Sequence, residues 1–229
     1  MRIRKKNWAQ KELERSDIYI ADPVCIADKR DIFSDANNLA IDMGCGKGVF
    51  LSEMALKEPG TNFIGIDVKR DMLAVAHRNI TENFRKAGKI PHNIKLIPYD
   101  ARWINGLFAE TFKADALFIN FPNPWSRERH KKRRLTYPGL LRQYREFLCE
   151  TADIIFRTDD RDLFFDTAGY LEQTGFEIVY STADYYADVA LENRYPPGEH
   201  ERYFSEKGQP VYYIQAKQRG MSFPFVEQY

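Results

Sequence analysis

The residues best suited to chemistry in this chain are a glycine-rich turn and the aspartates around it. Residues 42–48 read DMGCGKG, with a glycine at every second position after Asp42. Glycine lets a backbone turn tightly and approach a ligand closely. Two further aspartates, Asp67 and Asp100, end the next two apolar segments. Because parallel strands end at one edge of a sheet, the turn and the acids are expected to face one ligand there.

Two classes of ligand compete for this turn. A dinucleotide fingerprint, G-x-G-x-x-G/A, would need a small residue where the chain has Val49 or Leu51, which disfavours a nucleotide-dependent oxidoreductase. The order D-x-G-x-G-x-G resembles instead the first motif of class I S-adenosylmethionine (SAM) methyltransferases. A carboxylate at the end of the second strand, Asp67, can accept both ribose hydroxyls of an adenosine.

The resemblance to SAM enzymes implies a role for each member of this group. Asp42 would hold the positively charged amino-acid end of the cofactor, next to the turn. Asp100 would accept from the adenine amino group. The expected cofactor site comprises Asp42, Gly44, Gly46, Gly48, Asp67, Asp100, Ala101 and Asn123. The cofactor is expected to be SAM, and its product S-adenosylhomocysteine.

A dense run of positive charge follows the fourth apolar segment. Residues 120–135 read NFPNPWSRERHKKRRL, with six Lys or Arg within residues 127–134. A solvated helix face normally mixes signs, whereas here only Glu128 interrupts the cations. Such density repels itself unless phosphates neutralise it, and Trp125 and His130 add flat surfaces on which bases could stack. The run therefore favours a phosphate-binding surface over an ordinary solvated face.

Size and composition fit one enzyme-sized domain. The chain has 229 residues, 44% of them hydrophobic, and a net charge of +1. It has no apolar run long enough for a membrane span and no signal-peptide pattern. The three cysteines and four histidines are scattered without metal-ligand spacing, so we expect no metal and a cytoplasmic location. Residues 1–20 are predicted to form a basic, flexible arm, and residues 21–229 a single domain.

Alternating strand and helix patterns predict a doubly wound α/β fold. Short, nearly continuously apolar runs predict strands at residues 39–44, 62–67, 94–100, 116–121, 153–159, 176–182 and 210–217. Helical periodicity lies between several of them, at residues 48–57, 70–87 and 137–148. We expect a Rossmann-like, mostly parallel seven-stranded sheet. Its last two strands, which are close in sequence, should form an antiparallel edge.

Four motifs together resemble one family, the bacterial tRNA (guanine-N7-)-methyltransferases. The family hallmark is F-x-D-P-W followed by K-x-R-H-x-K-R-R-L, and here residues 121–135 read FPNPWSRERHKKRRL. The family patterns R-x-R-x-K-P-W-A-x-x-x-L, T-D-N-x-x-L-F and T-x-Y-E-x-x-F-x-x-K-G-x-P-I-Y resemble MRIRKKNWAQKEL, FRTDDRDLF and EHERYFSEKGQPVYY. The matches run in family order from residue 2 to about residue 216.

The resemblance implies transfer of the SAM methyl group to N7 of guanine 46 in the variable loop of tRNA. The implied catalytic residues are Asn123, Asp159 and Glu201. The implied substrate-binding residues are Arg127, Arg129, His130, Lys132, Arg133, Arg134, Asp159, Gly198, His200 and Glu201. tRNA would be the partner of a monomer or homodimer that binds neither membrane nor metal, and the N-terminal arm would contact the tRNA backbone.

The chain differs from the family at four of the positions with implied functional roles. Asn123 stands at the hallmark Asp and Arg127 at the following Lys, while Gly198 and His200 stand at the family Thr and Tyr. Two alternatives stay open, the first of them because of Asn123, Gly198 and His200. One is a SAM-dependent methyltransferase that acts on another RNA or another atom, and the other is a catalytically silent RNA-binding paralogue.

Overall fold

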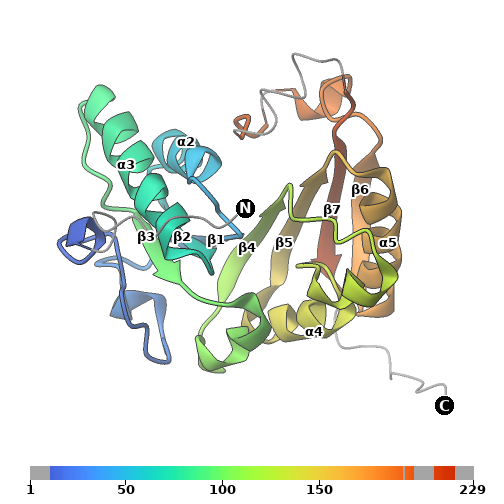
Figure 1. Ribbon diagram of the computed structural model, residues 1–229, viewed down its shortest axis with the longest axis horizontal. Coiled ribbons are helices and arrows are strands. Elements are labelled where there is room, and N and C mark those ends of the chain that lie inside the picture. The colour runs from blue at the N-terminus through green and yellow to red at the C-terminus, as the bar shows by residue number, and fades with distance from the viewer. Residues whose placement is uncertain (1–10, 193, 199–208, 220–229) are drawn as a thin grey trace.

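The computed structural model describes residues 11–192, 194–198 and 209–219, and it contains one seven-stranded sheet (Figure 1). The strand order is β3-β2-β1-β4-β5-β7-β6. The strands are β1 (Asn38–Met43), β2 (Thr61–Asp67), β3 (Ile94–Pro98), β4 (Ala114–Asn120), β5 (Leu148–Thr158), β6 (Phe176–Thr182) and β7 (Tyr212–Gln218). The first five strands in this order are parallel, and β7 runs antiparallel to both β5 and β6.

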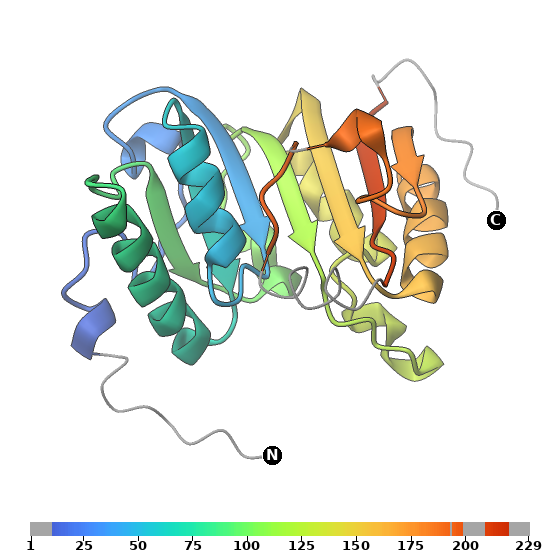
Figure 2. The same ribbon diagram turned by 90° about the horizontal axis from the view of Figure 1, so that it is seen from above.

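Helices cover both faces of the sheet, which explains why the strands are apolar on both sides (Figures 1 and 2). Helices α2 (Val49–Lys57) and α3 (Arg70–Lys86) pack in one core cluster with β2 and β3 side chains. Helices α4 (Pro138–Phe147) and α5 (Arg161–Gln173) pack in a second cluster with the 3₁₀ helix η2 (Ala101–Gly106). Three further 3₁₀ turns are η1 (Lys29–Asp31), η3 (Glu128–Arg133) and η4 (Val189–Leu191).

The strand order places a topological switch between β1 and β4. The chain moves outward from β1 through β2 to β3, and then returns to pair β4 with the other side of β1. The loops that leave β1 and β4 therefore diverge to opposite faces, which opens a crevice at the carboxyl ends of these strands. The glycine turn follows β1 and the Asn-Pro-Trp segment follows β4, so both reach this crevice.

The predicted fold is confirmed, with two differences in the elements. β5 begins at Leu148, five residues before the predicted strand, because it extends back to pair with β4 at Ala114. Helix α5 was not predicted. It begins after Asp160, whose side chain accepts a hydrogen bond from Leu163 N at 2.7 Å, an N-cap that satisfies an otherwise unpaired helix donor.

Residues 11–20 differ from the flexible arm expected for residues 1–20. Leu13 and Ile18 are buried. Ile20 N donates to Leu96 O at 3.0 Å and Leu96 N donates to Ile18 O at 2.7 Å, so this segment attaches to the free edge of β3. Apolar burial and backbone pairing at an otherwise open edge explain its order. The basic residues 1–10 lie outside the described residues. In the described part of the chain, no helix has the length and apolar character needed to cross a membrane.

Candidate active site

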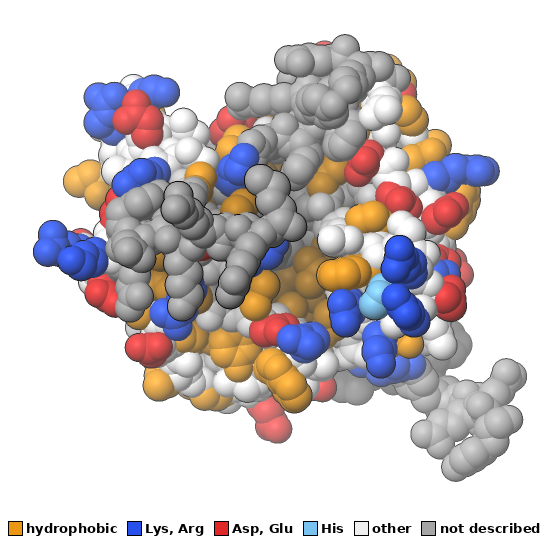
Figure 3. Space-filling view, in the orientation of Figure 1, with side chains coloured by type: hydrophobic (Ala, Val, Ile, Leu, Met, Phe, Trp, Pro, Cys, Tyr) orange, Lys and Arg blue, Asp and Glu red, His pale blue; other side chains and the backbone are white. Residues whose placement is uncertain are grey.

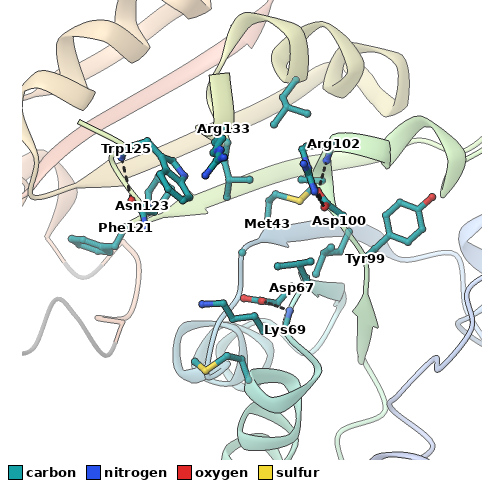
Figure 4. A pocket seen from close by; sticks show the side chains of 18 residues that line it. Met43, Asp67, Lys69, Tyr99, Asp100, Arg102, Phe121, Asn123, Trp125 and Arg133 are labelled. Carbon is teal, nitrogen blue, oxygen red and sulfur yellow. Dashed lines mark hydrogen bonds and ion pairs between the residues drawn. The ribbon is translucent and has the colours of Figure 1, made fainter. Parts of the chain in front are cut away.

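A cavity of about 580 Å³ lies at the carboxyl ends of β1 to β4 (Figure 4). Its lining combines strand ends, the glycine turn and the segment after β4: Met43, Gly44, Ile66, Asp67, Val68, Lys69, Met72, Tyr99, Asp100, Ala101, Arg102, Phe121, Pro122, Asn123, Trp125, Arg133, Leu135 and Leu140. Thus the turn, two of the strand-end acids and part of the basic run meet around one hollow. The cavity is apolar along much of its wall and charged at a few points, as is typical of small-molecule sites.

The glycine turn requires glycine for two physical reasons. Gly44 has φ +79°, and a Cβ there would lie 3.0 Å from Leu135 Cδ1, the residue that ends the basic run. Gly48 has φ +65°, and a Cβ there would lie 2.8 Å from the Cβ of Ala76 in α3. The first glycine therefore lets the turn approach the cavity wall, and the second lets α2 pack close to α3.

Asp67 is held at the cavity wall by the backbone on both sides of it. Its Oδ2 accepts from Gly46 N at 3.2 Å, and its Oδ1 accepts from Lys69 N at 2.8 Å. The carboxylate is half-buried and lines the cavity (Figure 4). Each carboxylate oxygen has a further lone pair, so this group can still accept hydrogen bonds from a bound ligand.

Asp42 occupies a different environment, inside the protein. It is 3% exposed and is not among the residues that line the cavity, although Met43 and Gly44 are. Burial raises the pKa of Asp42 to about 7, while the Arg157 charge and a hydrogen bond from Asn120 oppose that rise and the Asp67 charge adds to it. The ionised carboxylate is therefore disfavoured by burial and depends on these partners.

A buried arginine completes this interior network. Arg157, on β5, has no exposed surface, and its Nε donates to Asn120 Oδ1 at 2.8 Å. Asn120 Nδ2 in turn faces Asp42 Oδ1 at 3.4 Å. The guanidinium lies over three aromatic rings, those of Phe50 (4.8 Å), Tyr185 (5.6 Å) and Tyr195 (5.8 Å). The cation–π contacts and the Asn120 side-chain amide, which bridges Arg157 and Asp42, thus hold the Arg157 charge near the buried carboxyl of Asp42.

Asp100 and Ala101, which follow β3, form another part of the cavity wall. The Asp100 carboxylate accepts from Arg102 N at 3.0 Å and forms an ion pair with the Arg102 guanidinium (2.5 Å), which holds the pKa of Asp100 below its usual range. The side chains of Asp100 and Arg102 both line the cavity (Figure 4). A purine amino group at this wall would therefore meet a carboxylate that is already oriented by its neighbour.

The segment that follows β4, residues 121–125, has strained backbone where it lines the cavity. Phe121 and Trp125 have φ values of +47° and +43°, a region that non-glycine residues occupy at a cost of about 1–3 kcal/mol each. Phe121 N donates to Arg157 O at 2.8 Å, and Trp125 N donates to the Asn123 side-chain Oδ1 at 3.1 Å. Asn123 therefore fixes the turn that brings Trp125 to the cavity (Figure 4).

The basic run folds as η3, and its threefold period sorts the side chains onto three faces. On one face, His130 and Arg133 both approach the Trp125 ring, at 5.9 Å and 5.1 Å. On the second, Glu128 pairs with Lys131 at 3.0 Å. Arg129 and Lys132 share the third face and are exposed.

The basic run lies at the same edge of the molecule as the glycine turn. Figure 3 shows Lys and Arg side chains gathered beside an apolar hollow. Arg133 lines the cavity, and Leu135 at the end of the run lies against Gly44. A positively charged surface is therefore adjacent to the cavity that the glycine turn forms.

Arg134 differs from its expected role in binding RNA. It is 2% exposed, its Nε donates to Pro124 O at 2.7 Å, and its guanidinium pairs with Asp166 at 2.5 Å. Asp166 also contacts Lys131 at 3.1 Å. Arg134 therefore ties the basic run to α5 from within the protein, and its charge is not offered to a phosphate.

The other expected residues that the structure describes do not line the cavity: Gly46, Gly48, Arg127, Arg129, His130, Lys132, Asp159 and Gly198. Asp159 is exposed just beyond β5, beside the end of β4, but it does not line the cavity. Arg127 is exposed at the start of η3. Gly198 is buried at the end of a segment whose Tyr195 packs on Phe118 of β4. The expected His200 and Glu201 lie outside the described residues.

Sequence reasoning missed the Asp42–Asn120–Arg157 network and several apolar walls of the cavity. A signal for Arg157 was present, because a charged residue inside an apolar strand run needs a buried partner. Asn120, at a strand end, offered no such signal. In the part of the chain that the structure describes, no group of three His, Cys, Asp or Glu side chains could hold a metal ion.

Solved structures define the class of fold. An antibiotic-related methyltransferase superposes with a TM-score of 0.60 and 17% identity, over 83% of this chain and 92% of that chain. A 16S rRNA methyltransferase, KamB, superposes with a TM-score of 0.59 and 12% identity, over 84% and 93%. At these identities the likeness concerns the fold alone. The fold is that of the class I SAM-dependent methyltransferases.

Sequence comparisons define the family. A family model described as "Putative methyltransferase" matches residues 36–214. A tRNA (guanine-N(7)-)-methyltransferase of Acetivibrio thermocellus is 39% identical over 96% of this chain and 100% of its own length. One from Clostridium perfringens is 37% identical over 95% and 99%. The chain belongs to the tRNA (guanine-N(7)-)-methyltransferase family.

Proposed function

We propose that this protein transfers the methyl group of SAM to N7 of a guanine in tRNA, in the cytoplasm, and that the target is guanine 46 of the variable loop. The observation that carries the proposal is the junction of two features at one sheet edge. The 580 Å³ cavity is lined by the glycine turn and by strand-end acids, and Arg133 of the basic run forms part of its wall. A small-molecule site and a polyanion surface therefore meet where a methyl transfer would occur.

The residues around the cavity fit SAM. Gly44 leaves room that a Cβ would fill against Leu135, Asp67 keeps lone pairs for ribose hydroxyls, and Asp100 and Ala101 line the wall suited to the adenine. Asp42, with Arg157 and Asn120 behind it, would balance the cationic amino group of the cofactor. When bound, SAM supplies an electrophilic methyl group on a positively charged sulfur.

The protein's own contribution is positioning. Guanine N7 carries a free lone pair at neutral pH, so no side chain has to remove a proton before it reacts. The walls formed by Phe121, Trp125 and Leu135 would instead orient the base and exclude water, which is a large source of rate acceleration for aligned reactants. The strained Asn-Pro-Trp turn is consistent with such a positioning role, because functional sites commonly hold strained backbone.

Asn123 would orient the turn that carries Trp125, and it would not neutralise positive charge on the methylated guanine. Its side-chain oxygen accepts from Trp125 N, a bond that an Asp at this position would also accept. An Asp would in addition stabilise the positive charge that arrives on the methylated guanine. Asp159 at the end of β5 and Glu201 would be the remaining acids for that purpose. We therefore expect a competent site in which the turn, and not a charge on residue 123, is essential.

The direct test is product analysis with unmodified tRNA. Purified protein, SAM and an unmodified tRNA transcript are incubated, and the digested RNA is analysed by mass spectrometry. We expect 7-methylguanosine, mapped to position 46 and lost when that guanine is replaced by adenine. A methyl group on another atom would support the alternative methyltransferase. No methylated nucleoside at stoichiometric enzyme would support a silent RNA-binding paralogue.

A further inference from the structure

A second hollow, of about 680 Å³, lies against η3 and shares no lining residue with the first cavity. It is formed by η3, the first turn of α4 and the end of α5. Its lining residues are Glu128, Arg129, Lys131, Lys132, Tyr137, Pro138, Gly139, Arg142, Tyr170 and Gln173. It contains Arg129 and Lys132, two exposed cations that the family resemblance assigns to substrate binding, but its walls on α4 and α5 have no part in the function proposed above.

The charge of this second hollow is strongly positive. Four cations line it and one carboxylate, Glu128, does so. That carboxylate already pairs with Lys131, which also contacts Asp166. Across the described residues, no carboxylate forms an ion pair with Lys132 or Arg142, and both are exposed. Such a concentration of unneutralised cations favours an anionic ligand.

The backbone of α4 adds to this preference. Pro138 and Gly139, in the first turn of α4, line the hollow. Pro138 has no N–H and Leu140 N donates to Tyr137 O at 2.8 Å, so Gly139 supplies the N–H at the positive end of the helix dipole. Tyr137 and Tyr170 form its aromatic side, with ring centroids 5.8 Å apart. Cations, helix dipole and aromatic rings together are the features with which proteins hold the nucleic-acid backbone.

We propose that this second hollow binds a backbone phosphate of the tRNA next to the nucleotide that is methylated. The inference rests on the proposed function and adds Arg142, on α4, to the RNA surface. Lys132 lines the second hollow whereas its neighbour Arg133 lines the first. Adjacent Cα atoms are about 3.8 Å apart, so the two hollows border the same turn of η3. A nucleotide whose base enters the first cavity would then extend its backbone toward the second.

The test compares Arg142→Gln with a charge-matched control. Lys89→Gln is suitable because Lys89 is exposed in the loop before β3, at the opposite edge of the sheet from the cavity. For Arg142→Gln, we expect the Kd for unmodified tRNA to rise at least about tenfold, as for the loss of one charge-assisted hydrogen bond. The slope of log K against log salt should fall by about one. Lys132→Gln should act in the same direction, and SAM affinity should stay unchanged.

The possible results separate the two proposals. If Arg142→Gln and Lys132→Gln match Lys89→Gln in tRNA affinity and salt slope, the second hollow does not hold the backbone. If inorganic phosphate binds by calorimetry, and only that binding depends on Arg142, the hollow is a small-anion site and the inference is overturned. If the wild-type protein binds no tRNA, the proposed function itself fails. Thermal melting of each variant confirms that these surface changes leave the fold intact.

Discussion

The buried interior and the surface around the second hollow use arginines in opposite ways. Arg157 and Arg134 are buried, and each is surrounded by partners: an amide relay and aromatic rings for the first, a carboxylate and a carbonyl for the second. Arg129 and Arg142 are exposed around the second hollow, where cations outnumber carboxylates. Burial therefore decides which positive charges shape the protein and which remain available to a polyanion.

The largest effect expected from this difference is on stability, and neighbouring arginines offer a matched pair. Arg134→Gln should lower the free energy of unfolding by about 3 kcal/mol, because it leaves Asp166 without its buried partner and breaks the bond to Pro124 O. Arg133→Gln should change it by less than about 0.5 kcal/mol, since Arg133 is exposed. Urea unfolding measures both, and equal losses would contradict the division by burial.

The next effect concerns the cofactor. Replacing Arg157 by Met removes the cation that opposes the raised pKa of Asp42, so at pH 7 that carboxyl should be largely protonated. We expect SAM affinity to fall about tenfold, as a shift of one pKa unit implies, and Arg157→Lys to retain much of it. Calorimetry at pH 7 and pH 8.5 distinguishes this from simple damage. Affinity should partly recover at the higher pH, and a pH-independent loss would indicate a purely structural role.

The wild-type protein should show the same titration in its own pH profile. Because burial raises the pKa of Asp42 to about 7, the ionised form that suits a cationic ligand increases from pH 6 to pH 8, and SAM affinity should rise over that range. Folding stability should instead decrease as the pH rises. The contribution of this group is present below the unfolded pKa of about 4 and is lost as the pH rises through 7. Asp42→Asn should flatten both profiles, and an unchanged profile in that variant would assign the titration elsewhere.

The smallest effect is expected at Asn123. Asn123→Asp preserves the acceptor for Trp125 N and adds a negative charge beside the cavity, so the methylation rate should be equal or raised. Asn123→Ala removes the acceptor and should lower the rate more than the Asp substitution does. Single-turnover methylation of tRNA measures both. A large loss in Asn123→Asp would show that the amide has a role that the carboxylate cannot fill.

Much of the fold could be predicted because its signals are local. Continuous apolar runs marked the strands, since strands covered on both faces cannot alternate. Helix α5 was not predicted, although Leu163, Phe164, Thr167 and Leu171 lie on one buried face; the family motif FRTDDRDLF covers only its first turn. The packing of residues 11–20 against Leu96 depends on an open strand edge, which the sequence of that segment does not reveal.

The candidate site was predictable in outline and not in its electrostatics. Gly44, Asp67 and Asp100 line the cavity, as the strand ends indicated, whereas Asp42, Gly46 and Gly48 do not. The burial of Arg134 depends on Asp166, which lies 32 residues further along the chain, so a count of charges cannot identify which cation of the run is internal. The Asp42–Asn120–Arg157 network likewise joins three strands and exists only once the sheet has formed.

The central claim is that the cavity at the ends of β1 to β4 holds SAM, independently of the cations proposed to bind RNA. Calorimetric titration of SAM into the RNA-free protein tests it most directly, with Asp67→Asn and Arg142→Gln titrated in parallel. We predict one site per chain, at least about tenfold weaker binding in Asp67→Asn, and unchanged binding in Arg142→Gln. Absence of binding in the wild-type protein, or equal affinity in Asp67→Asn, would contradict the account.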